Sequence, residues 1–410
     1  MERIGQQAKK ASKSIGKAST VLKNQALTKI AEALLEHEKE IIIENAKDVI
    51  QARINGMKPS LIDRLALNHD RIQAISDSVL DIVKLDDPVG EVLSMTKRPN
   101  GLMIGQKRAP MGVIGVIYEA RPNVTVDAAV LCLKAGSAVI LKGGSDAIFS
   151  NIAIVNVMRE AISDILDADC IQLIEDTSRE STMKLMKMNK YLDLLIPRGG
   201  AGLIRAVVEN ATVPVIETGT GNCHIYVDGS ADIEMALAIL INAKTQRTGV
   251  CNAAESLLVH EKAADKFLPK AITALTEKGC EIRGCSITQK FNDKVIAASE
   301  EDFSTEFLDL IISCKVVKNL DEAIAHINEN STGHSECIIT NDYANANRFL
   351  DEIDSAAVYV NASTRFTDGG EFGFGAEMGI STQKMHARGP MGLKEMTTTK
   401  YIIYGNGQIR

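Results

Sequence analysis

The residue best suited to chemistry is Cys251, which lies in a short turn together with a glycine, an arginine and two side-chain amides. The turn occupies residues 244–255 and reads KTQRTGVCNAAE. Backbone N–H groups and nearby positive charge lower the pKa of a thiol from about 8.5 into the range where the thiolate is a nucleophile. Because a free cysteine is more often a small buried hydrophobe, the turn alone leaves both interpretations open.

Rigid elements are expected on both sides of this turn. Apolar residues at helical spacing predict a helix over residues 232–243, and the apolar run 256–260 predicts a buried strand. A tight turn between two such elements can hold a nucleophile still, which favours a catalytic role for Cys251.

Length and composition exclude several classes of protein. A chain of 410 residues with 45% hydrophobic residues is too long for one core and too apolar for disorder, so we expect two or three domains. The net charge of -7 is spread out, without a basic stripe, so we expect no nucleic-acid partner. No apolar run reaches the roughly 18 residues of a membrane span. Residues 1–7 are polar and do not resemble a secretory signal, so we expect a cytoplasmic protein.

The eight cysteines form neither a metal nor a disulfide pattern. No Cys-x-x-Cys pair occurs, and neither Cys223-His224 nor the pair Cys280 and Cys285 has zinc-ligand spacing. We therefore expect reduced thiols and no metal site.

Strand and helix patterns alternate from residue 111 onward, which predicts an α/β fold with two parallel-sheet domains. Residues 2–85 are expected to form a helical layer ahead of them. The expected strands of the first sheet are 112–118, 138–141, 171–174, 192–196 and 213–216. Those of the second sheet are 224–227, 256–260, 336–340 and 357–360. Ligands of such sheets bind at the carboxyl ends of the strands.

A small β element is expected to join copies of the chain. Asn100-Gly101 lies between two strand-like runs within residues 91–109 and is a strong hairpin signal, and residues 397–404 form another strand-like run. Exposed strand edges tend to be paired, so we interpret both segments as an assembly element of a homo-oligomer.

Two loops after strands of the first sheet are candidates for a nucleotide site. Gly199 and Gly200 lie where a strand meets a helix, a position at which backbone N–H groups can hold a phosphate, although a tight turn explains them equally well. Lys142 ends a strand and could reach a ribose or phosphate, unless it is simply solvated. Since no carboxylate follows it at once, the loop favours NADP over NAD.

Three further polar residues each allow two interpretations. Asn123 opens a helix, where its amide could donate to an oxyanion or merely cap the helix. Glu217 could be a general base or a surface carboxylate. We interpret His224, between Cys223 and Ile225, as a core histidine.

The order of these motifs resembles the aldehyde dehydrogenase superfamily. The runs that carry the resemblance are RPN at 121–123, KGGSDA at 142–147, ETG at 217–219 and GVC at 249–251. Longer runs resemble the branch that reduces L-glutamyl 5-phosphate to L-glutamate 5-semialdehyde in proline biosynthesis. They are GNCHIYVD at 221–228, QRTGVCN at 246–252, NASTRF at 361–366, FGFGAE at 372–377 and RGPMG at 388–392.

The resemblance implies how the chain is divided. It implies an NADPH-binding domain from residues 1–90 and 110–222, a catalytic domain from 223–390, and an oligomerisation element from 91–109 and 391–410. It also implies NADPH/NADP+ as the cofactor, and an association with glutamate 5-kinase is a further expectation.

The resemblance also implies roles for individual residues. Cys251 would be the nucleophile, with Asn123 and the Cys251 backbone N–H as the oxyanion hole. Lys142 would lie by the cofactor ribose, and Glu306-Phe307 would meet the nicotinamide ribose. The superfamily has Gly-Gly after its glutamate base, whereas Thr218-Gly219 follows here, so no role passes to Glu217.

The substrate end remote from the phosphate carries a carboxylate that the site must hold. Ser363, Thr364 and Arg365 follow a strand of the catalytic domain and offer hydroxyls and a guanidinium. Arg247 is a competing candidate for the carboxylate. The alternative for Arg365 is that it pairs with Asp368 or Glu371 and only stiffens its own loop.

Two rival functions remain open. An acylating, coenzyme A-dependent aldehyde dehydrogenase would share the fold and the cysteine, and would differ in the group that leaves. A non-enzymatic nucleotide-binding module would leave Cys251 inert.

Overall fold

The computed structural model describes the backbone of residues 1–410 and every side chain except that of Ser60. The chain divides into two compact units. Unit 1 comprises Met1–Thr218, Gly373–Gly379 and Met391–Arg410. Unit 2 comprises Gly219–Phe372 and Ile380–Pro390. Among the described residues, no helix is both long and apolar enough to cross a bilayer.

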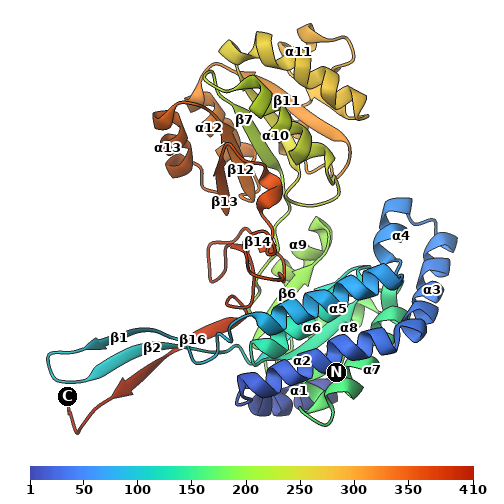
Figure 1. Cartoon of the computed structure of the whole chain (residues 1–410), viewed down its shortest axis with the longest axis vertical. Coiled ribbons are helices and arrows are strands. Elements are labelled where there is room, and N and C mark those ends of the chain that lie inside the picture. Colours follow the sequence, from blue (N-terminus) through green and yellow to red (C-terminus); the bar gives the residue numbers. More distant parts are fainter. The chain divides into compact units, whose positions relative to one another are not determined.

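Unit 1 opens with helices, as the periodicity predicts. They are α1 (Glu2–Ile15), α2 (Thr20–Glu36), α3 (Glu38–Ile54), α4 (Pro59–Leu65) and α5 (His69–Lys84). A four-stranded parallel sheet follows in the order β5-β4-β3-β6, made of β3 (Val113–Tyr118), β4 (Ala138–Gly143), β5 (Ile171–Leu173) and β6 (Leu194–Arg198). The helices between and after the strands are α6 (Pro122–Lys134), α7 (Ile148–Ile162), α8 (Arg179–Leu185) and α9 (Ala201–Asn210) (Figure 1).

The central strands β3 and β4 are buried along their whole length, which explains their continuous apolar sequences. The strand predicted at residues 213–216 is wrong, because this segment makes only an isolated bridge between Leu195 and Val215. Pro214 has no N–H to donate, so the ladder cannot extend through it.

Unit 2 contains a seven-stranded sheet in the order β10-β9-β11-β8-β7-β12-β13, whose pairs are all parallel. The predicted strands are β7 (Cys223–Val227), β8 (Ala254–His260), β12 (Ser335–Ile339) and β13 (Ala357–Val360). The strands that were not predicted are β9 (Glu281–Gly284), β10 (Ile296–Ala297) and β11 (Ile311–Val317). The run IISCKVV of β11 is rich in β-branched residues, a signal that could have found it.

Helices cover both faces of this second sheet. One core is formed with α10 (Ile233–Thr245) and α11 (Glu261–Glu277), and the other with α12 (Leu320–Asn330) and α13 (Tyr343–Glu352) (Figure 1). The expectation of an α/β fold with two parallel-sheet domains is thereby confirmed.

The hairpin and the C-terminal run form a separate antiparallel sheet in the order β1-β2-β16 (Figure 1). Its strands are β1 (Val92–Lys97), β2 (Met103–Pro110) and β16 (Thr397–Tyr404). The hairpin turn ends at Gly101, whose φ of 91° suits glycine. The two segments therefore pair with each other inside one chain, and β1 is exposed throughout.

Candidate active site

The Cys251 turn lies at the amino end of β8, beside the amino end of β7, in the middle of the unit 2 sheet. The rule that ligands bind at the carboxyl ends of parallel strands therefore does not describe the Cys251 turn. Cys251 is half-buried, and all eight cysteines are reduced thiols.

The main chain of Cys251 is held from two sides. The Cys223 thiol donates to the Cys251 carbonyl oxygen at 3.1 Å. Gly221 packs against the same peptide so closely that a Cβ on it would lie 1.5 Å from that oxygen. Only glycine fits at position 221, because any side chain would push the nucleophile out of place.

Gly221→Ala should therefore disturb the nucleophile more than the fold. Overpacking of this kind costs about 1–3 kcal/mol of unfolding free energy, and we expect alkylation of Cys251 by iodoacetamide to slow as its turn shifts. Gly202→Ala is the matched control, since a Cβ there would meet nothing within 4 Å. Equal alkylation rates in the two variants would contradict the contact.

Arg365 lies at the Cys251 turn. Its guanidinium donates to Asn252 Oδ1 and, at 3.1 Å, to Gln246 Oε1. Burial and the positive charge of Arg247 lower the pKa of Arg365, while the charge of Asp368 and, to a lesser extent, that of Cys251 act in the opposite direction. Arg365 thus donates to neutral side chains of the turn, while the charge of Asp368 in its own loop also acts on it.

Asn252 joins the Cys251 turn to the segment that carries Arg365. Its side-chain Nδ2 donates to the main-chain carbonyl of Thr367 at 2.9 Å. Its main-chain carbonyl accepts from Thr364 Oγ1 at 2.8 Å. Ser363 Oγ accepts from the Arg365 N–H at 3.3 Å. Both hydroxyls therefore shape the loop, and a substrate contact for Ser363 and Thr364 stays a prediction.

Glu306 also belongs to this part of unit 2. Its Oε1 accepts from the Gly221 N–H at 2.7 Å, and burial raises its pKa. The neighbouring Phe307 ring lies 5.1 Å from the Arg283 guanidinium, measured to the ring centroid. The structure thus links Glu306, through Gly221, to the peptide of Cys251.

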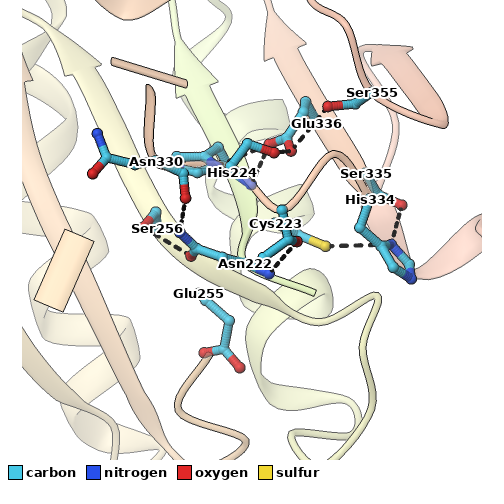
Figure 2. Close-up of polar contacts among 12 residues, drawn as sticks. Asn222, Cys223, His224, Glu255, Ser256, Asn330, His334, Ser335, Glu336 and Ser355 are labelled. Carbon is cyan, nitrogen blue, oxygen red and sulfur yellow. Dashed lines mark hydrogen bonds and ion pairs between the residues drawn. The ribbon is translucent and has the colours of Figure 1, made fainter. Parts of the chain in front are cut away.

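A buried polar network surrounds Cys223 and His224, the first two residues of β7 (Figure 2). His224 Nδ1 lies 2.9 Å from Glu336 Oε2, and both side chains are fully buried. The interpretation of His224 as a core histidine is therefore confirmed. Cys223 Sγ lies 3.7 Å from His334 Nδ1 (Figure 2), and burial raises the pKa of Cys223 well above its usual value. Cys223 thus stays protonated, as a donor to Cys251 rather than a second nucleophile.

The candidate cofactor residues of unit 1 lie at the carboxyl ends of β4 and β6. Lys142 is 3% exposed, so it is not a solvated strand end. Its Nζ donates to the Gly143 carbonyl at 3.2 Å, while burial lowers its pKa. An ammonium group has three donors, which suits contacts to ribose hydroxyls as well.

The backbone of the Gly199-Gly200 loop already donates a hydrogen bond to a carboxyl group in this structure. Glu119 Oε2 takes the Gly200 N–H at 3.1 Å, and a Cβ on Gly199 would lie 2.6 Å from the Glu119 carboxyl carbon. A phosphate needs the same close backbone approach at the start of a helix. A phosphate held by this loop would have to displace the Glu119 carboxylate, and the role of the loop at the cofactor stays a prediction.

Asn123 is exposed in the first turn of α6, after the N-cap Arg121. Because the helix begins at Pro122, the alternative of Asn123 as the cap is wrong. Asn123 Nδ2 donates to Asp127 Oδ2 at 3.1 Å, and burial raises the pKa of Asp127 to about 6. Glu217 is half-buried near the end of unit 1.

The sequence profile of the aldehyde dehydrogenase family matches residues 1–280 and 294–402. The chain therefore belongs to the aldehyde dehydrogenase family and is an oxidoreductase. An acetylating aldehyde dehydrogenase from Geobacillus thermoglucosidasius shares the fold, with a TM-score of 0.71 at 17% identity over 100% of this chain and 97% of its own.

Much closer relatives are gamma-glutamyl phosphate reductases. The Clostridium perfringens enzyme is 61% identical over 407 residues, covering 99% of this chain and 98% of its own. The Carboxydothermus hydrogenoformans enzyme is 60% identical over 408 residues, with the same coverage. A crystal structure of the Thermotoga maritima enzyme has a TM-score of 0.97 and 53% identity, over 100% of this chain and 99% of its own.

Proposed function

We propose that the chain reduces L-glutamyl 5-phosphate to L-glutamate 5-semialdehyde with NADPH, in proline biosynthesis. The observation that carries the proposal is the half-buried Cys251. Its main-chain carbonyl packs against Gly221 and accepts from Cys223, and Arg365 donates to the same turn. Relatives about 60% identical over their whole length bear the name of this activity.

The residues of the Cys251 turn suggest a mechanism. The Cys251 thiolate attacks the acyl carbonyl carbon, and the bond to the phosphate oxygen breaks, so inorganic phosphate leaves and a thioester remains. Negative charge on the carbonyl oxygen would be met by the Cys251 N–H and the Asn123 amide. When bound, NADPH would supply the hydride that reduces the thioester and would leave as NADP+. The hemithioacetal formed on Cys251 would then release the aldehyde and regenerate the thiolate. No hydrolytic water is needed, so the chemistry requires no base at Glu217.

The function is best tested in reverse. We expect NADP+ reduction with pyrroline-5-carboxylate, the cyclic form of the semialdehyde, to require inorganic phosphate. If coenzyme A replaces phosphate as the required acyl acceptor, the chain is an acylating aldehyde dehydrogenase. If neither supports turnover while NADP+ still binds, the chain is a nucleotide-binding module.

The cofactor assignment rests on unit 1. Lys142 would lie at the ribose and Gly199-Gly200 at a phosphate, while Glu306-Phe307 of unit 2 would meet the nicotinamide ribose. Gly143, Gly144 and Ser145 follow Lys142, so no carboxylate stands directly after it to repel a ribose phosphate. A higher kcat/KM with NAD+ than with NADP+ would reject the preference.

The carboxylate of the substrate provides a prediction about Arg365. Arginine grips a carboxylate through two parallel hydrogen bonds that lysine cannot copy, so Arg365→Lys should raise KM for pyrroline-5-carboxylate roughly tenfold or more. The KM for NADP+ should stay near its original value. If only the phosphate dependence shifts, Arg365 is not the carboxylate clamp, and Arg247→Lys becomes the variant to measure.

We further propose that the β1-β2-β16 sheet joins copies of the chain into a homo-oligomer in the cytoplasm. Its exposed side chains include Val92, Met95, Tyr401 and Ile403, an apolar set that favours a partner. Deleting residues 397–410 removes β16 and should leave a monomer or an aggregate. An unchanged subunit count by light scattering would place the interface elsewhere. Association with glutamate 5-kinase stays a prediction for co-purification.

A further inference from the structure

A buried ion pair closes the base of the Cys251 turn. Lys244 lies in the last turn of α10 and Glu255 is the second residue of β8. Lys244 Nζ lies 2.5 Å from Glu255 Oε2, and neither side chain is exposed. The pair thus brackets the stretch of chain that contains both Arg247 and Cys251.

Glu255 also holds a second segment of unit 2. Its Oε1 accepts from the Leu308 N–H at 3.0 Å. Leu308 has a φ of 54°, in the left-handed region that residues other than glycine rarely adopt. Such a conformation persists where the surroundings fix it. One carboxylate therefore ties the Cys251 turn to the segment that carries Glu306 and Phe307.

Fold stability alone does not explain two buried charges at this place. Desolvation offsets most of the attraction in a buried ion pair, and apolar residues of the same volume are often as stable. Burial raises the pKa of Glu255 to about 7, while Lys244 opposes the shift and Glu306 adds to it. Unlike an apolar contact, the ion pair fixes the distance and orientation between the end of α10 and the start of β8.

We infer that Lys244 and Glu255 are positioning residues, which hold the Cys251 turn in register with Glu306 and Phe307. This inference rests on the proposed function, in which the thioester on Cys251 must meet a hydride donor held by the 306–308 segment. Small displacements of reacting groups are costly, since a 1 Å misplacement can slow a reaction about 10²-fold.

The main test uses Lys244→Met together with Lys244→Met/Glu255→Gln. The single variant leaves a buried carboxylate without its partner and should lower both the melting temperature and kcat. The double variant removes both charges but keeps an acceptor for the Leu308 N–H, so its melting temperature should recover. Its kcat should stay roughly 10–100-fold below that of the wild type, with KM for NADP+ little changed. If kcat of the double variant recovers together with its melting temperature, the pair has only a structural role and the inference is wrong.

A second variant keeps the test decisive if the first ones fail to fold. Glu255→Asp retains both charges, but its carboxylate is shorter by one methylene and cannot reach both Lys244 and Leu308. We expect kcat to fall about tenfold or more. Wild-type kcat in this variant would overturn the inference.

A matched control lies in unit 1, where Lys23 and Asp87 form an ion pair at 2.5 Å with side chains 1% and 9% exposed. Lys23→Met/Asp87→Asn should change the melting temperature without lowering kcat. Alkylation of Cys251 by iodoacetamide serves as a readout that needs no substrate. It should slow in the Lys244 and Glu255 variants and stay unchanged in the Lys23→Met/Asp87→Asn variant. If the wild type shows no phosphate-dependent turnover, the proposed function fails. Wild-type alkylation rates in those variants would separately overturn the positioning role.

Discussion

Replacing Cys251 by serine should abolish turnover while leaving the fold and cofactor binding intact. A serine hydroxyl is far less acidic than a thiol, and it needs a general base before it can act as a nucleophile. The proposed mechanism contains no such base, so attack on the acyl carbon should nearly cease. We expect a loss on the order of 10⁴-fold or more in kcat, within the range found when other enzymes lose their nucleophile. Steady-state rates and titration of NADP+ binding would measure the two effects separately.

Cys285 provides the matched control for this variant. It is the other half-buried cysteine, and although burial acts against it, hydrogen bonds from Thr288 and Val316 lower its pKa. Cys285→Ser should keep turnover, and alkylation that inactivates the enzyme should map to Cys251. Substantial activity in Cys251→Ser, or inactivation that tracks Cys285, would remove Cys251 from the mechanism.

The features that sequence predicted well are those encoded locally. The Cys251 turn is visible because a helical period and an apolar strand flank one cysteine and one arginine within a dozen residues. The buried strands β3, β4, β7 and β8 are continuous apolar runs, and this pattern alone predicts a sheet covered on both faces. His224 could be interpreted as a core residue because apolar neighbours surround it in the chain.

The features that sequence missed depend on distant residues or on one backbone atom. Nothing near Gly221 in the sequence shows that its missing side chain makes room for the Cys251 carbonyl. Lys244 and Glu255 each look like ordinary charged residues until the strand order brings them together in a dry interior. The strand predicted around Pro214 was wrong for a local reason. Its apolar residues predicted a hydrogen-bonded ladder, but proline has no N–H with which to continue one.

The oxyanion donor is the second prediction with a large expected effect. Asn123→Ala should lower kcat by about 10²–10³-fold, because removing one preorganised donor to a developing oxyanion costs roughly that much. The side-chain amide has two N–H donors, and one is taken by Asp127 Oδ2 at 3.1 Å. That bond orients the amide and leaves the other N–H for the substrate. Burial raises the pKa of Asp127 to about 6, so rates measured at pH 8 keep this acceptor ionised.

Two further variants separate transition-state stabilisation from binding and from helix structure. Asn123→Asp keeps the shape of the side chain but replaces the donor with an acceptor, so it should be at least as slow as Asn123→Ala. Asp127→Asn removes the ionised acceptor that orients Asn123 while leaving the amide itself in place, so it should cost less than either. If Asn123→Ala changes only KM, the amide binds the ground state, and the Cys251 N–H must stabilise the oxyanion with other donors.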